Sequence, residues 1–381
     1  MRLLHTSDLH LGKRVYECSM LDEQEHILEQ IVSIAKERAA DAVLLSGDLY
    51  DKTVPPVEAV TLLDRFLTSL SDQGIPVFLI SGNHDSAERL SFGGKILEKQ
   101  GLYFGTEFTG VLEERTLKDE YGKIHIYLLP FVKPAAVRKI FPEEQVESYE
   151  DAVRLILQKT EMDPDARNVL LAHQLITDNG TEPERCDSET VSVGGVEQVD
   201  YSLFSAFDYV ALGHLHGPQS VGRETVRYSG SPLKYSFSEW RQKKSVTLVT
   251  LGEKGSVELE TVPLTPRHDM REIRGKLDNL IAPDVVSLGD PEDYLRVILT
   301  NDAPPYDAIG RLRSVYRNVL RVDLERAGKE AAEEETAAKQ VENKTMMELF
   351  SEFYQMANGA PMTEAETTVM ETIMEELEGR A

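Results

Sequence analysis

The sequence predicts a layered α/β domain over residues 1–265, a small α/β domain over 266–325, a charged linker over 326–344 and C-terminal helices over 345–381. Three observations lead to this division. Short apolar runs recur through the first part of the chain, amphipathic stretches separate the first of these runs, and the composition changes near Pro263 and again after Leu324. A chain of 381 residues has room for two or three domains.

Six apolar runs predict the strands of the first domain. In order they are RLLHT, DAVLLS, VFLI, IHIYLL, NVLLA and DYVALG, and a polar cluster follows most of them. Nearly continuous apolar runs are typical of strands buried on both faces of a layered α/β fold. Between the first two runs, residues 21–40 place Ile27, Leu28 and Ile31 on one helical face. Further along, we expect residues 225–239 and 244–264 to form strands and hairpins.

The last segment predicts two short amphipathic helices, the second opened by a capping box of Thr363 and Glu366. Their apolar positions are Met346, Leu349, Phe350 and Phe353 in the first helix, and Met370, Ile373, Met374 and Leu377 in the second. Two such helices have too little core to stand alone. They either pack back on the main body or bind a partner, and Met-rich faces suit an adaptable binding surface.

The chain carries a formal net charge of −25, which by simple electrostatics argues against nucleic acid as a partner. The charge is uneven, because residues 323–381 contain 15 acidic and only 5 basic residues. Cys18 and Cys186 are the only cysteines, so neither a disulfide framework nor a thiolate zinc site is expected. We expect a cytoplasmic protein with no signal peptide and no membrane span.

Side chains of the metal-ligand type recur where the predicted strands end. They are Asp8, His10, Asp48, Asp51, Asn83, His84, Asp85, His173, His214 and His216. Sites assemble at the carboxyl ends of strands in open α/β sheets. A single histidine there is more often structural than a ligand, but five such clusters together indicate a site. Asp8 and His10, like His214 and His216, are two positions apart. In an extended segment both would face one side, with the intervening leucine in the core.

Carboxylates and imidazoles without thiolate favour Mn²⁺, Mg²⁺, Fe²⁺ or Zn²⁺. Six or seven protein ligands are too many for one catalytic ion. They suit two metals that lie about 3.5–4 Å apart and share a carboxylate. Such a pair activates water and clamps the oxygens of a phosphoryl group. Two divalent ions also outweigh the charges of Asp8 and Asp48, so the site would be locally positive inside an acidic protein.

Other patterns of catalysis or binding are weaker. Gly230 lies between two serines, but the Gly-x-Ser-x-Gly pattern of serine hydrolases is missing, as are a P-loop and a dinucleotide-binding glycine loop. The basic cluster Arg241, Lys243 and Lys244 could contact a phosphate backbone, although a solvated hairpin end is the favoured interpretation. Four further histidines are expected to be structural: His5, His26, His125 and His268.

The motifs DLHLG, GDLYD, GNHD, AHQ and GHLH resemble, in this order, those of calcineurin-like metallophosphoesterases. Flanking segments such as GNHDSAERLSFG, SETVSVGG and RYSGSPLKYSFSE narrow the resemblance to the SbcD family of bacterial nuclease subunits, which work with SbcC ATPases. The resemblance is close over residues 1–265 and looser beyond. It implies a two-sheet metallophosphoesterase sandwich flanked by helices, a small DNA-capping domain, and C-terminal helices that bind the base of the ATPase coiled coil.

The resemblance also implies a role for each ligand-type residue. Asp8, His10 and His216 would hold one Mn²⁺, Asn83, His173 and His214 would hold the other, and Asp48 would bridge them; Mg²⁺ could substitute. His84 would not be a ligand. It would contact the scissile phosphate or protonate the leaving oxygen, with its ring oriented by Asp85. Asp51 would not bind a metal itself but would support the metal ligands from the surrounding shell of residues.

The function implied by this resemblance is an Mn²⁺-dependent DNA exonuclease and endonuclease that processes double-strand ends and hairpins in repair, recombination and replication. It would act in a heterotetramer of two nuclease and two SbcC-type ATPase subunits. The nuclease subunits would form a homodimer through helices of the first domain, and the apolar positions of the C-terminal helices would bind the ATPase. A stand-alone phosphatase and a non-enzymatic scaffold remain alternatives. The apolar tail argues against the first, and the complete ligand set against the second.

Overall fold

The computed structural model describes residues 1–189 and 197–325, together with positions 347, 350, 351, 353–355, 361–363, 366, 367, 369 and 370. The chain divides into two compact units. The first comprises Met1–Glu189 with Gln198–Leu324, and the second comprises Thr190–Glu197 with Glu325–Ala381. All elements that position the candidate site belong to the first unit.

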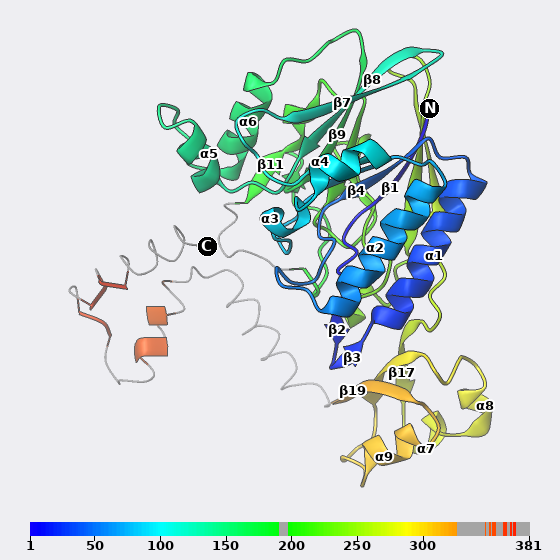
Figure 1. The fold of residues 1–381 in the computed structure, drawn as a ribbon. Coiled ribbons are helices and arrows are strands. Elements are labelled where there is room, and N and C mark those ends of the chain that lie inside the picture. Colours follow the sequence, from blue (N-terminus) through cyan, green and yellow to red (C-terminus); the bar gives the residue numbers. More distant parts are fainter. Residues whose placement is uncertain are drawn as a thin grey trace. The chain divides into compact units, whose positions relative to one another are not determined.

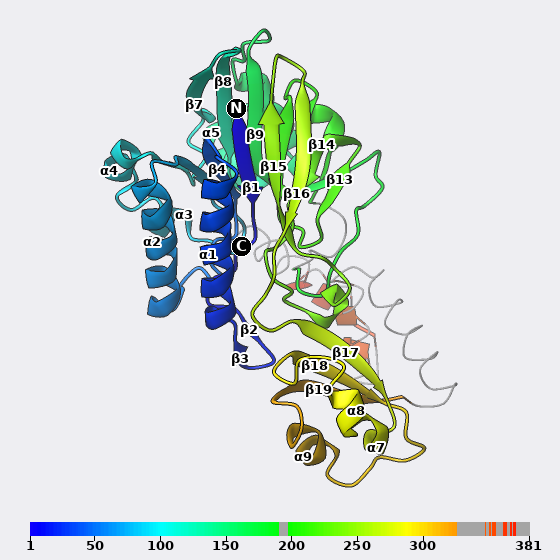
Figure 2. The ribbon, with the colours of Figure 1, turned by 90° about the vertical axis from the view of Figure 1, so that its right-hand side faces the viewer.

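Two six-stranded sheets form the body of the first unit (Figure 2). The first sheet has the order β16-β15-β1-β4-β5-β6, and the second has the order β13-β14-β12-β9-β8-β7. The strands of the first sheet are β1 (Arg2–Thr6), β4 (Ala42–Ser46), β5 (Val77–Ile80), β6 (Leu102–Gly105), β15 (Ser245–Leu251) and β16 (Val257–Pro263). Those of the second are β7 (Glu113–Asp119), β8 (Gly122–Leu129), β9 (Arg167–His173), β12 (Tyr209–Gly213), β13 (Gln219–Val221) and β14 (Arg223–Tyr228). All six predicted strands are confirmed, and the centre of each sheet is parallel.

Both faces of the central strands are buried, as their apolar runs predict. In β4, Val43 and Leu45 pack under the helices, whereas Leu44 faces the opposite sheet. Phe78 and Tyr209 are fully buried in this inter-sheet core. Each such side chain contributes about 1.5–3 kcal/mol relative to an exposed position. The apolar core between the two sheets therefore stabilises their packing against each other.

Helices cover the outer faces of this sandwich. Helices α1 (Leu21–Glu37) and α2 (Val57–Asp72) lie side by side on the first sheet (Figure 1). Helices α5 (Pro134–Ile140) and α6 (Tyr149–Lys159) pack on the second. The predicted face of α1 is confirmed, since Ile27, Leu28 and Ile31 are buried. The remaining elements of this domain are β2 (Arg14–Val15), β3 (Cys18–Ser19), α3 (Ala87–Leu90), α4 (Gly94–Leu97), η1 (Glu98–Gln100), β10 (Leu175–Thr177), β11 (Gln198–Asp200), η2 (Tyr201–Phe204) and η3 (Phe237–Glu239).

A small α/β fold follows, with a core of its own. Its three parallel strands are β17 (Met270–Gly275), β18 (Tyr294–Leu299) and β19 (Asn318–Leu324), and its helices are α7 (Leu277–Leu280), α8 (Pro283–Val286) and α9 (Ala308–Arg313). Glu23 of α1, almost fully buried, joins it to the first domain. Its carboxylate lies 2.7 Å from the His268 ring and accepts the main-chain N–H of Arg267 at 2.9 Å. The division at residue 266 and the extent of the linker stay predictions.

One expected segment of strand is absent. The hairpin predicted over 244–264 is confirmed by β15 and β16, but only the start of the segment 225–239 is a strand, and Ser229–Ser236 form a loop. Gly230 explains the break, because it has a φ of +75° and its α-carbon lies against the His216 carbonyl, which a Cβ would meet at 2.6 Å. The loop is thus bent toward a residue of the candidate site.

In the second unit, the described residues bear out part of the expected helices. Thr363 and Glu366 form the predicted capping box. Phe350 contacts the ring of Phe353, and Met370 is helical. The linker over 326–344 lies outside the described residues. So do the other expected apolar positions of the two helices, which are Met346, Leu349, Ile373, Met374 and Leu377. Among the described parts of the chain, no helix is long and apolar enough to cross a membrane.

Candidate metal centre

The ligand-type side chains converge at the carboxyl ends of parallel strands from both sheets. Asp8 and His10 follow β1, Asp48 follows β4, and Asn83 follows β5 in the first sheet. From the second sheet, β9 ends at His173, and His214 and His216 follow β12. The sheets approach closely here, because a Cβ on Gly213 would lie 1.9 Å from the Ser46 carbonyl oxygen. Ligand-type residues that are as far apart in sequence as Asp8 and His216 therefore lie close together.

The backbone of these segments is not extended, which corrects one expectation. Asp8, His10, Asp48 and His214 have φ values of 54°, 44°, 50° and 106°. Such left-handed conformations cost about 1–3 kcal/mol each and cluster at functional sites. Main-chain hydrogen bonds between the loop after β1 and the loop after β4 offset this cost. The Asp8 N–H donates to the Gly47 carbonyl at 3.0 Å, and the His10 N–H donates to the Asp48 carbonyl at 3.0 Å. The buried leucines between the paired ligands are as predicted, but tight turns rather than strand pleating aim the side chains.

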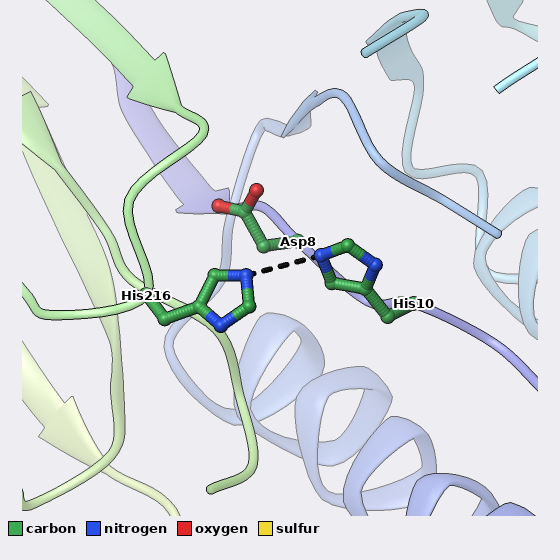
Figure 3. A group of neighbouring side chains, drawn as sticks. All are labelled: Asp8, His10 and His216. Atoms are coloured by element: carbon green, nitrogen blue, oxygen red, sulfur yellow. Dashed lines mark hydrogen bonds between the residues drawn. The ribbon is translucent and has the colours of Figure 1, made fainter. Parts of the chain in front are cut away.

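Asp8, His10 and His216 form one group of donors (Figure 3). Their ligand atoms lie within 4.8 Å of one another, and the Nε2 atoms of the two histidines are 3.1 Å apart. The His214 main-chain N–H holds the Asp8 carboxylate at 3.0 Å. Burial raises the pKa of Asp8, and burial lowers that of His10. Burial thus disfavours the ionised form of Asp8 and the protonated form of His10, and a bound cation would favour the carboxylate and the neutral imidazole that are its ligands.

Asn83, His173 and His214 form a second group. The Asn83 amide oxygen lies 3.1 Å from Nε2 of His173 and 3.0 Å from Nδ1 of His214. The other ring nitrogen of His173, Nδ1, is 2.8 Å from the Ser46 carbonyl, so Nδ1 carries the proton. The lone pairs of Nε2 and the Asn83 oxygen then face each other and require a shared proton or metal ion between them.

Asp48 lies between the two groups. One carboxylate oxygen is 3.3 Å from His173 Nε2 and 3.6 Å from His10 Nε2. The other accepts the main-chain N–H of His84 at 2.9 Å. Although burial opposes ionisation, the surrounding histidines hold the pKa of Asp48 below its usual value. For His173, burial lowers the pKa, but Asp48 and Asp8 outweigh it and raise the value to about 9. A buried carboxylate thus serves both groups at once.

His84 lies beside the first group of donors. Its Nδ1 is 2.9 Å from the main-chain carbonyl of Asp51, and its ring is 4.8 Å from that of His10. Asp85 instead accepts main-chain N–H groups of Leu49, Tyr50 and Gly82 at 2.9–3.1 Å. The Asp51 carbonyl thus contacts the His84 ring, and Asp85 joins the loop after β4 to the loop after β5, while the expected orientation of the His84 ring by Asp85 stays a prediction.

The Asp51 side chain lies at the edge of the candidate site. Its carboxylate accepts a hydrogen bond from Lys13 Nζ at 2.8 Å and lies 3.7 Å from His10 Nδ1. A ligand role for His84 also fits the distances, since its ring nitrogen lies within 4.8 Å of donor atoms of His10 and Asp48. Geometry alone therefore allows His84 either role.

Several residues around the donors were not expected from the sequence. Ser188, Glu189, Glu239 and Lys244 surround His216. Lys244 is only 5% exposed and binds Glu239, so the interpretation of a solvated hairpin end is wrong for this residue. Gln24 of α1 stabilises the loop after β1, because its side-chain amide donates a hydrogen bond to the His10 carbonyl at 2.7 Å. No local pattern marks these side chains, because each acts through a contact distant in sequence.

The donor set fits a divalent metal. Imidazole nitrogens, carboxylates and an amide oxygen converge from the described residues, and no thiolate takes part. Such a set suits Mn²⁺, Fe²⁺, Zn²⁺ or Mg²⁺. The cluster supports the binding of divalent metal, and the two-sheet fold that carries it is that of the metallophosphoesterases, a class of enzymes that hydrolyse phosphate esters with metal.

Comparisons with known proteins agree. The family described as Calcineurin-like phosphoesterase matches residues 1–218, and that described as Type 5 capsule protein repressor C-terminal domain matches residues 266–358. The SbcD subunit of the nuclease SbcCD from Staphylococcus epidermidis is 34% identical over 324 residues, which is 84% of each chain. The chain belongs to the calcineurin-like phosphoesterase family and, within it, to the SbcD subunits. It is a metal-dependent phosphodiester hydrolase.

Two solved structures align less closely. The protein TT1561 of Thermus thermophilus is 14% identical, with a TM-score of 0.39, and the alignment covers 68% of this chain and 98% of that one. A dimetal phosphatase from Danio rerio is 11% identical, with a TM-score of 0.39, covering 70% and 99%. At these TM-scores neither likeness bears on the assignment.

Proposed function

We propose that this protein is an Mn²⁺-dependent DNA exonuclease and endonuclease that hydrolyses phosphodiester bonds with two metals, as the nuclease subunit of an SbcC–SbcD-type complex. One observation carries the two-metal proposal: the Asp48 carboxylate lies within 3.3–3.6 Å of histidines from two separate donor groups. A carboxylate shared in this way is the arrangement by which a protein holds two metals about 3.5–4 Å apart.

In this proposal, Asp8, His10 and His216 hold one metal, Asn83, His173 and His214 hold the other, and Asp48 joins the two. Bound metals supply Lewis acidity and activate water for attack on phosphorus. The imidazole-rich set favours Mn²⁺ over Mg²⁺, which prefers oxygen ligands and dehydrates reluctantly, so that Mg²⁺ would substitute less well.

His84 acts on the substrate rather than on the metals. With Nδ1 facing the Asp51 carbonyl, the ring presents Nε2 to the scissile phosphate or gives a proton to the leaving oxygen. Asp85 and Asp51 are positioning residues. Asp85 fixes the main chain on both sides of the site, and the Asp51 carbonyl orients the ring.

DNA and an SbcC-type ATPase are the proposed partners, in a heterotetramer of two nuclease and two ATPase subunits. The name of the Staphylococcus epidermidis relative supports both DNA and the SbcC-type ATPase as partners. In the C-terminal helices, Phe353 and Val369 are 66% and 60% exposed, which suits a docking surface for the ATPase coiled coil. The small domain would cap the DNA, and the complex would work in the cytoplasm, in repair, recombination and replication.

A homodimer through the first domain is also proposed. Val57 at the start of α2 is 76% exposed, and Phe92 and Ile96 in the segment of α3 and α4 are 88% and 73% exposed. A contiguous exposed apolar patch, unlike a single exposed apolar side chain, marks an interaction surface. A second copy of the same surface would cover them.

A nuclease assay with and without the ATPase partner tests the proposal. We expect cleavage of linear double-stranded and hairpin DNA with Mn²⁺, weaker cleavage with Mg²⁺, and stimulation by the ATPase with ATP. Efficient hydrolysis of a small phosphodiester without any cleavage of DNA would instead establish a stand-alone phosphodiesterase. Neither activity in a protein that still binds the ATPase would support the scaffold alternative.

A further inference from the structure

The ring of His216 ends a largely buried series of hydrogen-bonded side chains that runs away from the donor group. Its Nδ1 lies 2.7 Å from the Ser188 hydroxyl, which lies 2.6 Å from the Glu239 carboxylate. Lys244 closes the chain, with Nζ 2.6 Å from the other Glu239 oxygen. His216 and Glu239 are 1% and 0% exposed, whereas Ser188 between them is half-buried.

Proton counting fixes the direction of each hydrogen bond. Glu239 serves only as an acceptor, since one oxygen receives the Ser188 and Ser236 hydroxyls and the Tyr235 main-chain N–H. If Ser188 donated to His216 instead, two lone-pair oxygens would face each other at 2.6 Å. Ser188 therefore donates to Glu239 and accepts from Nδ1–H of His216. The tautomer that remains has its lone pair on Nε2, the atom that faces His10.

The same residues also hold the backbone of His216. Glu189, next to Ser188, accepts the His216 main-chain N–H at 2.7 Å, and Lys244 donates to the His216 carbonyl at 2.9 Å. Ring and main chain are thus held from two directions. His173 differs, because its Nδ1 rests on the main-chain carbonyl of Ser46, which substitution cannot remove.

We propose that Ser188 and Glu239 are positioning residues for one of the two metals, setting the tautomer and orientation of His216 so that Nε2 binds the ion shared with Asp8 and His10. This inference rests on the proposed two-metal function. Partners of this kind raise metal affinity by roughly 10- to 100-fold. Ser188 and Glu239 act on one donor group only. Among the described residues, the second group contacts neither of them; that group consists of Asn83, His173 and His214.

Mn²⁺ titration of the metal-depleted full-length protein tests the proposal by site number and affinity, without reference to activity. We expect two sites in the wild type. In Ser188→Ala one site should weaken about tenfold while the other keeps its affinity. Ser188→Thr, which retains the hydroxyl, should restore the affinity. Ser236→Ala is the matched control, since Ser236 also donates to Glu239 at 2.9 Å but does not contact His216.

Combination with Asn83→Ala identifies the affected site. Asn83→Ala alone should weaken the second site, and the double variant should weaken both. Equal affinities in Ser188→Ala and wild type would overturn the inference, as would a loss at the Asn83 site only. A wild type that binds fewer than two Mn²⁺ would instead overturn the proposed two-metal function. The melting temperature in chelator, expected to match the wild type for Ser188→Ala, separates lost affinity from lost folding.

Discussion

The Nε2 atoms of His10 and His216 lie 3.1 Å apart, although 206 residues separate them in the chain. The two rings come from different sheets, so their approach depends on the packing of the whole sandwich. Two imidazoles that face each other need a cation or a proton between them. Metal binding and folding should therefore be linked in this protein.

The first prediction concerns metal removal. Chelation should lower the melting temperature, and excess Mn²⁺ should restore it, because an ion that binds only the folded state stabilises it by about 2.7 kcal/mol per site at 100 times its Kd. Scanning calorimetry measures the shift. It should shrink when His10 and His216 are both replaced by Ala and persist in His26→Ala, whose ring instead bonds Gln30. An identical melting curve with and without chelator would contradict the linkage.

The role of His84 can be separated from metal binding. His84→Ala should lower hydrolysis by about 10²- to 10⁴-fold, the range for loss of a general acid. Elemental analysis should still find two metals per chain. His26→Ala serves as the control for loss of an imidazole elsewhere. Loss of metal together with activity would show that His84 is a ligand, a role that the donor distances allow.

The close approach of the sheets should be intolerant of added volume. In Gly213→Ala, the new Cβ would lie 1.9 Å from the Ser46 carbonyl oxygen and 2.8 Å from His173 Nδ1. We expect a loss of at least about 1–3 kcal/mol in unfolding free energy, measured by urea denaturation, with weaker metal binding. Gly94→Ala is the matched control, because its Cβ would meet only Phe104 at 3.8 Å. Equal stability of both variants would contradict this view of the contact.

The Asp119 carboxylate should make stability depend on pH. Its hydrogen bonds with Arg167 lower its pKa, and the N-terminal amine at 3.0 Å adds to this. Because the folded pKa lies below the unfolded value of about 3.9, the stabilisation is complete above that pH and is lost as the pH falls through the folded pKa. Asp119→Asn should cost about 1.5–3 kcal/mol at pH 7, typical of hydrogen bonds to charged groups.

Denaturation of wild type and Asp119→Asn across pH 3–7 measures this difference. The gap between the two proteins should be constant from pH 5 to 7 and should narrow below about pH 4. Glu120→Gln, at the neighbouring exposed position, should show little difference at any pH. A gap that widens toward acid would contradict the assigned sign.

The exposed apolar side chains of the C-terminal helices should be needed for partner binding. Phe353→Ser with Val369→Ser removes two side chains that are 66% and 60% exposed. We expect loss of co-elution with an SbcC-type ATPase, while the metal content of the nuclease domain stays unchanged. Ser351→Ala is the control within the same segment. Unchanged co-elution would contradict the proposed docking surface.

Six central strands, the buried face of α1 and the positions of the ligand-type residues could all be predicted from the sequence, because apolar runs and helical periodicity are local properties of the chain. The sequence also identified Asp8, Asp48 and His173 as parts of one site, since parallel strands end at a common edge.

The orientation of these side chains, in contrast, depends on contacts that form only in the folded protein. The left-handed turns at Asp8, Asp48 and His214 are strained locally and persist through hydrogen bonds between distant loops. The Asp51 carbonyl at His84, and Ser188 and Glu239 behind His216, likewise act across long separations in sequence. No periodicity or motif encodes such contacts, because they exist only once the two sheets have packed.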